Sequence, residues 1–306
     1  MNRRVLIGFM SVMLSLPAGL AAGADTPGTA APGAAVVISS VANMHKVSND
    51  TVELVSQTVL GTNVKILAWE KNGGEEWFRI ETPDTYQGWM IGTSLRLLPE
   101  GGKPYASEGS VFEVTSLMAN IYATDDVTER KPIVVAPIGS RLEVGACGER
   151  WCEVTLPCGM KGWVQKGDGE VKDAAMARKK LTPDETVALA KRFLGTPYLW
   201  GGNSPLGIDC SGFAQLLYHL SGIEILRDAD IQMTKSGLVE VPLGQERTRD
   251  LVFFGRTKDK ITHVGMMISG EEFINSTTYR KPMVQISQLK DPHWQELYQA
   301  ARREKE

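Results

Sequence analysis

The spacing of hydrophobic positions changes near residue 180, and this change divides the chain into two parts. Upstream, short runs such as residues 64–69 and 141–144 carry hydrophobic and polar side chains close to alternation, with tight turns between them. Alternation with a period of two predicts β-strands that bury one face. The first part is therefore predicted to consist of small β domains.

The β region contains an internal repeat. Trp77 and Trp89, twelve residues apart, recur as Trp151 and Trp163 with an offset of 74 residues. The segments WFRIETP and WCEVTLP follow the first tryptophan of each pair, and a glycine precedes the second. Such self-similarity predicts two copies of one fold. Because closing short strands into a barrel removes their exposed edges, we predict two small β-barrels, at residues 37–100 and 104–170.

Residues 180–306 have helical spacing first and strand-like runs afterwards. Residues 182–185 (TPDE) form a capping box with proline at the first helical position. The stripe that follows contains Val187, Ala190 and Leu194, and Gly195 is the expected end of the helix. A second helix is predicted over residues 210–220, and strands over 251–254, 263–268 and 272–275. This order indicates an α+β domain.

The first 24 residues have the features of a signal peptide. Arg3 and Arg4 precede an apolar run over residues 5–16, and residues 22–24 (AGA) fit a cleavage site. The run is shorter than the roughly 20 residues that a membrane-spanning helix needs. Residues 25–36, rich in alanine, glycine, proline and threonine, are predicted to be a linker. We therefore expect an exported chain, periplasmic or secreted, without a membrane span after cleavage.

Composition places the chain among globular proteins. It has 306 residues, of which 42% are hydrophobic and 23% charged, so two or three domains with buried cores are expected. The net charge is only −3. Such a balance provides no broad basic surface, which argues against nucleic acid as a partner.

The four cysteines fall into two groups. Cys147, Cys152 and Cys158 lie within 12 residues of one another, and Cys210 stands alone. Zinc normally takes four ligands, and no histidine lies near the cluster. In an oxidising compartment the cluster is better explained by one disulfide with one thiol left over. Cys210 then has no local partner and is free to react.

Cys210 and His263 are the candidates for nucleophilic catalysis. Cys210 stands at the predicted start of the second helix, after a glycine-rich approach, where unpaired N–H groups favour a thiolate and predict a lowered pKa. A nucleophilic cysteine also needs a base, usually histidine, and a polar group that orients the imidazole. His263 opens one predicted strand and Asn275 ends the next.

A geometric condition applies to His263 and Asn275. Side chains alternate along a strand, so two residues face the same side only if the turn near residues 269–270 has an odd length or a bulge is present. We therefore predict a three-residue loop or a bulge there. This geometry would bring the Asn275 side-chain oxygen to the imidazole.

Several motifs resemble the NlpC/P60 cysteine peptidase family. They are PYLWGG at 197–202, GIDCSGF at 207–213, DLVFFG at 250–255, THVG at 262–265 and FINS at 273–276. The resemblance implies a papain-like α+β fold over residues 180–306, with Cys210 as nucleophile, His263 as base and Asn275 as orienting residue. The third position is often histidine in this family, but an asparagine can also orient an imidazole. Tyr198 matches a family tyrosine whose hydroxyl would help the Cys210 N–H to stabilise the oxyanion.

The repeated β unit resembles a bacterial SH3-like domain that is present twice. Two such domains before an NlpC/P60-like domain resemble the γ-D-glutamyl-L-diamino acid endopeptidases (dipeptidyl-peptidase VI). These cut the bond between D-Glu and the diamino acid in cell-wall peptides with a free N-terminal L-Ala. The resemblance implies that Asp228 binds this amine, because a desolvated ammonium needs an anionic partner. Asp209 and Ser211 would line the same pocket. Arg227 would pair either with Asp228 or with the D-Glu carboxylate.

The repeat adds a separate indication for Tyr86. It lies three residues before Trp89, and the second copy has Met160 at that place. A tyrosine present in one copy alone need not belong to the barrel core. The resemblance implies that Tyr86 walls off the substrate pocket and that Glu53 adds a second carboxylate near the amine.

Two other functions are compatible with these motifs. One is a broad D,L-endopeptidase acting on intact wall, and the other is a wall-binding protein without catalysis. In each case the partner is peptidoglycan or peptides derived from it. The predicted chemistry needs no metal or other cofactor, and the metalloprotease pattern His-Glu-x-x-His does not occur in the sequence.

Overall fold

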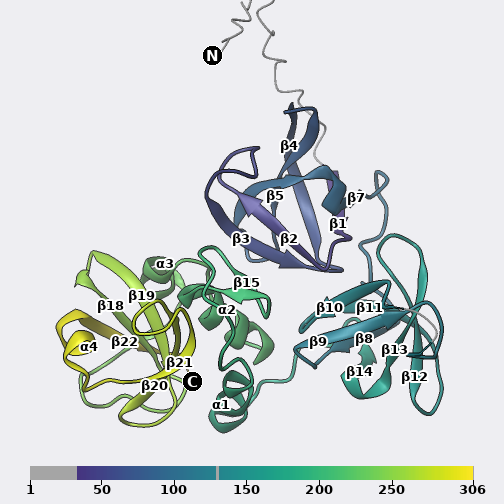
Figure 1. Cartoon of the computed structure of the whole chain (residues 1–306). Helices are drawn as coiled ribbons and strands as arrows, with labels where there is room; N and C mark the ends of the chain where they lie inside the picture. Colours follow the sequence, from purple (N-terminus) through teal and green to yellow (C-terminus); the bar gives the residue numbers. More distant parts are fainter. Residues whose placement is uncertain (1–32, 129–130, 306) are drawn as a thin grey trace, which may run out of the picture.

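The computed structural model describes residues 33–128 and 131–305. Figure 1 shows two β domains and an α+β domain, with α2 and β15 on the side of the α+β domain that faces the first β domain. The predicted signal peptide, and residues 25–32 of the predicted linker, lie outside the described residues. The first strand already begins at Gly33, inside the segment predicted as linker, because it pairs with two later strands.

The first β domain is one antiparallel sheet with the order β3-β2-β6-β5-β4-β1-β7. Its strands are β1 (Gly33–Val37), β2 (Val41–His45), β3 (Leu54–Val59), β4 (Asn63–Asn72), β5 (Glu75–Glu81), β6 (Gln87–Ile91) and β7 (Leu95–Leu97). A 3-10 turn at Gly92–Ser94 links the last two. Alternate residues of these strands, including Met44, Ile80 and Met90, are buried in the core of this domain.

The second β domain repeats this topology. Its strands are β8 (Ser110–Val114), β9 (Met118–Tyr122), β10 (Val134–Pro137), β11 (Arg141–Cys147), β12 (Trp151–Thr155), β13 (Lys161–Gln165) and β14 (Gly169–Asp173). Their order is β10-β9-β13-β12-β11-β8-β14. Each strand takes the place of the strand in the first sheet whose number is lower by seven, so the two sheets have the same strand order. A 3-10 turn at Lys166–Asp168 again precedes the last strand. The internal repeat is therefore confirmed.

The α+β domain has one antiparallel sheet with the order β17-β22-β18-β19-β20-β21. These strands are β17 (Val239–Val241), β18 (Leu251–Thr257), β19 (Lys260–Met267), β20 (Glu272–Thr277), β21 (Met283–Gln288) and β22 (Tyr298–Arg303). The helices are α1 (Pro183–Lys191), α2 (Cys210–Leu220), α3 (Ala229–Lys235) and α4 (Pro292–Leu297), and a short hairpin consists of β15 (Asn203–Ser204) and β16 (Gly207–Ile208). α2 packs against β19 and β20 through an apolar core.

The predicted capping box is present at the start of α1. Thr182 Oγ1 accepts from Glu185 N at 3.2 Å, and Glu185 Oε2 accepts from Thr182 N at 2.8 Å. The helix, however, ends at Lys191. The chain then turns, so Leu194 is 45% exposed and its predicted place in the apolar stripe is wrong.

The cysteine cluster contains one disulfide, as predicted. It joins Cys147 to Cys152 within the β11–β12 hairpin, and Cys158 is an exposed free thiol. The pairing is the one that the strands allow, since these two residues lie opposite each other in the ladder. Among the residues that the structure describes, no helix is long and apolar enough to span a membrane.

The first β domain is joined to the α+β domain by polar contacts. Gln57 Oε1, on β3, accepts from Asn203 N at 3.0 Å and from Ser204 Oγ at 3.1 Å. Asp84 Oδ2 accepts from Gln215 Nε2, on α2, at 2.8 Å. Both contacts reach elements that flank Cys210, so this interface positions the candidate site.

Candidate active site

Cys210 is the first residue of α2, as predicted. Asp209 is the N-cap residue, and its Oδ1 accepts from Gly212 N at 2.7 Å. The β15–β16 hairpin approaches so closely that a Cβ on Gly202 would lie 2.4 Å from Gly207 O. The glycines before Cys210 thus allow the backbone segments to pack closely just before the helix begins. Cys210 is only 8% exposed, and its sulfur accepts hydrogen bonds from the backbone N–H groups of Val264 and Ser211.

The predicted lowering of the Cys210 pKa is wrong. Burial raises the pKa of the thiol to about 12, and the neighbouring Asp209 carboxylate acts in the same direction. The two backbone N–H groups and Arg227 lower it by less. The cost of removing a thiolate from water therefore exceeds its stabilisation by the start of the helix, and Cys210 is a neutral thiol at rest.

His263 and Asn275 meet across the β19–β20 hairpin. The ladder pairs Met266 with Ile274, and Ile268 N donates to Glu272 O at 2.9 Å. Only residues 269–271 remain for the turn, so the predicted three-residue loop is confirmed. The histidine and the asparagine consequently face the same side, and Nε2 of His263 lies 3.0 Å from Oδ1 of Asn275.

A fixed amide orientation determines which ring nitrogen of His263 carries the proton. Asn275 is completely buried, and its Nδ2 donates to Ser287 Oγ at 3.0 Å and to Gln285 O at 3.3 Å. Its Oδ1 must then accept a hydrogen bond from His263 Nε2–H. Nδ1 is left as the unprotonated nitrogen. The backbone N–H of Val264, the next residue, contacts the sulfur of Cys210, and Nδ1 is the ring nitrogen whose lone pair can accept a proton.

Aromatic side chains enclose the imidazole. Trp294 stacks on it, with ring centroids 4.9 Å apart and an interplanar angle of 22°, and Phe254 lies 5.8 Å away. Burial lowers the pKa of His263 to about 4, while its hydrogen bond to Asn275 opposes this shift and the charge of His293 adds to it. The enclosure therefore keeps the imidazole neutral, as a general base requires.

Tyr198 lies close to the nucleophile. It pairs with Ile208 in a parallel bridge, and its N–H donates to Pro282 O at 2.9 Å. Burial raises the pKa of its phenol, and the charge of Cys210 is the next largest contribution. The hydroxyl thus stays protonated beside the sulfur and can donate to a developing oxyanion.

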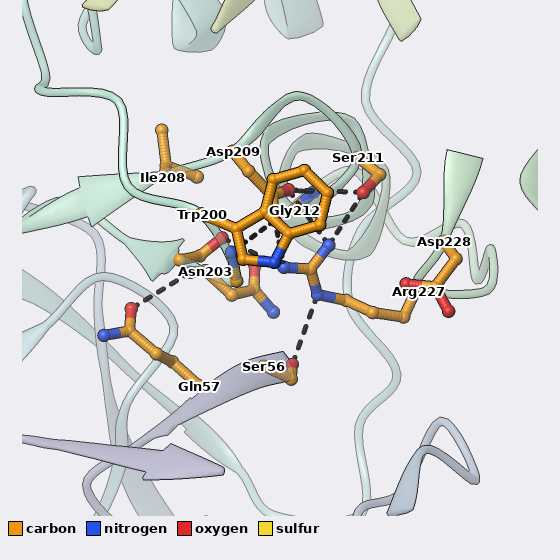
Figure 2. A network of polar contacts seen from close by, with 12 residues as sticks. Ser56, Gln57, Trp200, Asn203, Ile208, Asp209, Ser211, Gly212, Arg227 and Asp228 are labelled. Carbon is orange, nitrogen blue, oxygen red and sulfur yellow. Dashed lines mark hydrogen bonds and ion pairs between the residues drawn. The ribbon is translucent and has the colours of Figure 1, made fainter. Parts of the chain in front are cut away.

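Arg227 pairs with Asp209 and not with Asp228. It is buried, and its guanidinium binds Asp209 through two nitrogens, at 3.0 and 2.6 Å. The remaining donors contact Ser211 Oγ at 2.8 Å and Ser56 Oγ at 3.2 Å, as Figure 2 shows, and Gly202 O at 3.3 Å. All five N–H donors of an arginine are then used within the protein, and none is left for a substrate carboxylate or for Asp228.

Asp209 and Ser211 are likewise occupied by structural contacts. Asp209 Oδ2 also accepts from Gly201 N at 2.9 Å, and Ser211 Oγ donates to Asp209 Oδ1 at 3.2 Å. Both residues are buried. These contacts hold the entry to α2, because the buried arginine requires their oxygens, and the predicted place of the two residues in a substrate pocket stays a prediction.

Asp228 and Tyr86 meet across the domain interface. Tyr86 Oη lies 3.4 Å from Asp228 Oδ1, and Met160, which takes the place of Tyr86 in the second copy, is 55% exposed. Asp228 precedes α3 but makes no capping hydrogen bond with its side chain. Burial raises the pKa of this carboxyl, against the opposing charge of Arg227. The carboxylate is thus half-buried and available to a cation.

Glu53 stands at the edge of the same region. Its Oε1 accepts from Trp200 Nε1 at 3.3 Å, and its Oε2 pairs with Lys46 at 3.2 Å. Trp200 is 61% exposed and lies in front of the Arg227 network in Figure 2. The structure therefore places Glu53 on the outer rim of the site, beside an exposed indole.

Three contributors to the site escaped the sequence analysis: Ser287, Trp294 and Gln57. Each acts through a contact with another element, which for Trp294 and Gln57 is distant in sequence, so no local motif marks it. A weak signal existed for Trp294 alone, since the preceding Asp-Pro pair is a helix start, and Asp291 does cap α4. Nothing in that signal indicates that the indole stacks on His263.

Comparisons with known proteins agree with this geometry. Residues 195–303 match the NlpC/P60 family. A γ-D-glutamyl-L-lysine dipeptidyl-peptidase of Bacillus cereus is 31% identical over 261 residues, which cover 82% of this chain and 75% of the relative. The Bacillus subtilis protein of the same name is 35% identical over 249 residues, covering 74% and 76%.

The fold is also found among solved structures. A crystal structure of an NlpC/P60 family protein from Bacillus cereus superposes with a TM-score of 0.75 at 25% identity. The match covers 88% of this chain and 99% of that one. The likeness thus extends over both β domains as well as the α+β domain.

Proposed function

Since the chain belongs to the NlpC/P60 family of cysteine peptidases, we propose that it hydrolyses the bond between D-Glu and a diamino acid in peptidoglycan peptides with a free N-terminal L-Ala. The observation that carries this proposal is the Asp228 carboxylate, half-buried at the domain interface and held only by Tyr86. A free ammonium is the group that such a carboxylate stabilises. The relatives from Bacillus are named γ-D-glutamyl-L-lysine dipeptidyl-peptidases, and these names support the proposed cleavage between D-Glu and a diamino acid.

The proposed reaction is acyl transfer in two steps. Nδ1 of His263 takes the Cys210 proton while the sulfur attacks the γ-carbonyl carbon of D-Glu. The Cys210 N–H, unpaired at the start of α2, and the Tyr198 hydroxyl bind the oxyanion. The imidazolium then protonates the leaving amine of the diamino acid. A water deprotonated by His263 releases the dipeptide from the thioester and restores the thiol.

The β domains fit this proposal as parts of the site. We infer that both are SH3-like barrels, on the basis of their shared topology. The first one supplies Tyr86 to the amine site and closes one side of it, which limits the substrate to short, free N-termini. We also propose export, from the signal-peptide features of residues 1–24. N-terminal sequencing of the exported protein should then start near Asp25.

Mass spectrometry of products from L-Ala-γ-D-Glu-diaminopimelate tests the catalytic assignment. Cys210→Ala should abolish release of L-Ala-γ-D-Glu and leave the thermal unfolding transition in place. Cys158→Ala is the matched control, because this exposed thiol lies outside the site, and it should keep full activity. Turnover by the Cys210→Ala variant would overturn the assignment of the nucleophile.

The amine requirement is tested separately with the N-acetylated peptide. Acetylation removes the ammonium, so cleavage should stop, and Asp228→Asn should raise KM for the free peptide roughly tenfold or more. Equal cleavage of both peptides would identify a broad D,L-endopeptidase. Binding to intact sacculi without cleavage of any peptide would identify a wall-binding protein.

A further inference from the structure

We propose that Ser287 is a positioning residue of the active site, whose hydroxyl holds the amide of Asn275 against His263. The inference rests on the proposed function, since it concerns the same catalytic pair. Ser287 lies on β21, away from every motif that marks the family in the sequence. It contacts neither Cys210 nor His263 directly, so it acts through Asn275.

The register of the sheet brings Ser287 to this place. β20 and β21 pair Phe273 with Ser287 and Asn275 with Gln285. Ser287 is therefore the diagonal neighbour of Asn275 on the same face, within reach of a side-chain amide. The distance from Asn275 Nδ2 to Ser287 Oγ is 3.0 Å, shorter than the 3.3 Å to the carbonyl of Gln285.

The two acceptors have different tasks. A carbonyl oxygen only accepts, so Gln285 O disfavours the flipped amide, in which an oxygen would face it. Ser287 supplies the better hydrogen bond and keeps Nδ2 in position. Together they leave Oδ1 directed at His263 Nε2, which fixes the proton on Nε2 and the lone pair on Nδ1. An asparagine at this position depends on such anchoring because its amide has two orientations of nearly equal shape.

The surroundings of Ser287 make the anchor necessary. A cavity of about 370 Å³ lies beside it, lined also by Gln285 and Trp294. Without the Ser287 hydroxyl, Nδ2 of Asn275 retains only the longer contact to Gln285 O, and the amide can move toward this space. The hydrogen bond that His263 donates to Asn275 raises the pKa of His263 against burial, so weakening that bond lowers this pKa further.

The experiment compares Ser287→Ala with Ser287→Thr, which keeps the hydroxyl. Loss of one hydrogen bond predicts a fall in kcat of roughly five- to tenfold in Ser287→Ala, with KM unchanged and the acid limb of the pH–rate profile at lower pH. Ser287→Thr should stay within about twofold of the parent protein. Ile286→Ala is the matched control, since this side chain is partly exposed on the same strand.

A second readout needs no substrate. In ¹⁵N-labelled protein, the His263 Nε2–H proton should give a resolved resonance that broadens in Ser287→Ala and is restored in Ser287→Thr. An unchanged resonance and an unchanged pH profile in Ser287→Ala would overturn the inference while the proposed function stands. If no variant, including the parent, cleaves peptide, the resonance still decides the inference. Should the alanine variant not fold, Ser287→Cys, with its weak acceptor, provides the same comparison.

Discussion

At the scale of single residues, the site keeps two catalytic groups uncharged until substrate is present. Burial moves the pKa values of Cys210 and His263 in opposite directions, to about 12 and about 4. A thiol and a neutral imidazole are then the resting state, and transfer of the proton accompanies attack.

The first prediction concerns the pH dependence of activity. His263 must be neutral to act as base, and its pKa lies below the ordinary value near 6.5. We therefore expect the acid limb of the kcat/KM profile to have its midpoint below pH 6.5, toward pH 4. Steady-state rates between pH 3.5 and 8 provide the measurement. A midpoint at or above 6.5 would show that the imidazole is not desolvated as described.

The same shift predicts a pH dependence of stability. Above pH 6.5 both the folded and the unfolded chain carry a neutral His263. Between pH 6.5 and about 4 only the unfolded chain binds the proton, so folding stability falls as the pH is lowered through this window. The loss amounts to at most about 3 kcal/mol. Urea unfolding of the parent protein and His263→Gln at pH 7.5 and 4.5 isolates this contribution, which the glutamine variant should lack.

At the scale of elements, the β19–β20 hairpin sets the geometry of the base. Its three-residue turn puts His263 and Asn275 on one face of the sheet. Gly265 has no side chain, which leaves room for the side chains of His263 and Asn275 to meet. Continuing the register places Gly265 opposite Asn275. A Cβ on Gly265 would lie 2.4 Å from a ring carbon of Phe273 and 3.2 Å from Cβ of Asn275. Glycine is required there by close packing.

Gly265→Ala should therefore impair both folding and catalysis. The added methyl must displace Phe273 or Asn275, and overpacking of this kind costs about 1–3 kcal/mol. Chemical denaturation and kcat measured on the folded fraction test the two effects. Gly270→Ala is the control, since nothing lies within 4 Å of the corresponding Cβ. Equal behaviour of the two variants would contradict the packing argument.

Most elements that carry the site were predictable from local patterns. The start and end of α2, the capping box of α1 and the strands bearing His263 and Asn275 all follow from spacing within a short window. β22 was not predicted, although it lies between β17 and β18 in the sheet. Neither was α4, whose Trp294 covers His263. Both β22 and α4 contribute through the elements that they pack against, and hydrophobic periodicity does not specify packing partners.

At the scale of the whole molecule, Arg227 joins three parts of the chain. It ties the first β domain through Ser56, the β15–β16 hairpin through Gly202 and the start of α2 through Asp209. The guanidinium is buried, and the Asp209 carboxylate beside it has lost most of its contact with water. The nucleophile and the domain interface consequently depend on one ion pair.

Arg227→Met should destabilise the protein by about 3–5 kcal/mol, because Asp209 is left buried without a countercharge. Arg227→Lys should not restore stability, since an ammonium lacks the planar fork that reaches both carboxylate oxygens. Thermal or urea unfolding is the measurement. The control is Arg280→Met, which removes an exposed pair with Asp291 and should change stability by less than about 1 kcal/mol. Similar effects of both substitutions would contradict the assigned role of Arg227.

The sequence by itself determined the features that depend on neighbours along the chain. These are the duplicated β unit, the cysteine at a helix start, and a histidine and an asparagine on one face of a hairpin. Each follows from a period of two or 3.6 residues or from turn chemistry. Tertiary structure alone decided the protonation of Cys210, the partners of Arg227 and the anchoring of Asn275. Those depend on desolvation and on contacts between distant segments, such as Arg227 and Ser56, 171 residues apart, which local patterns do not encode.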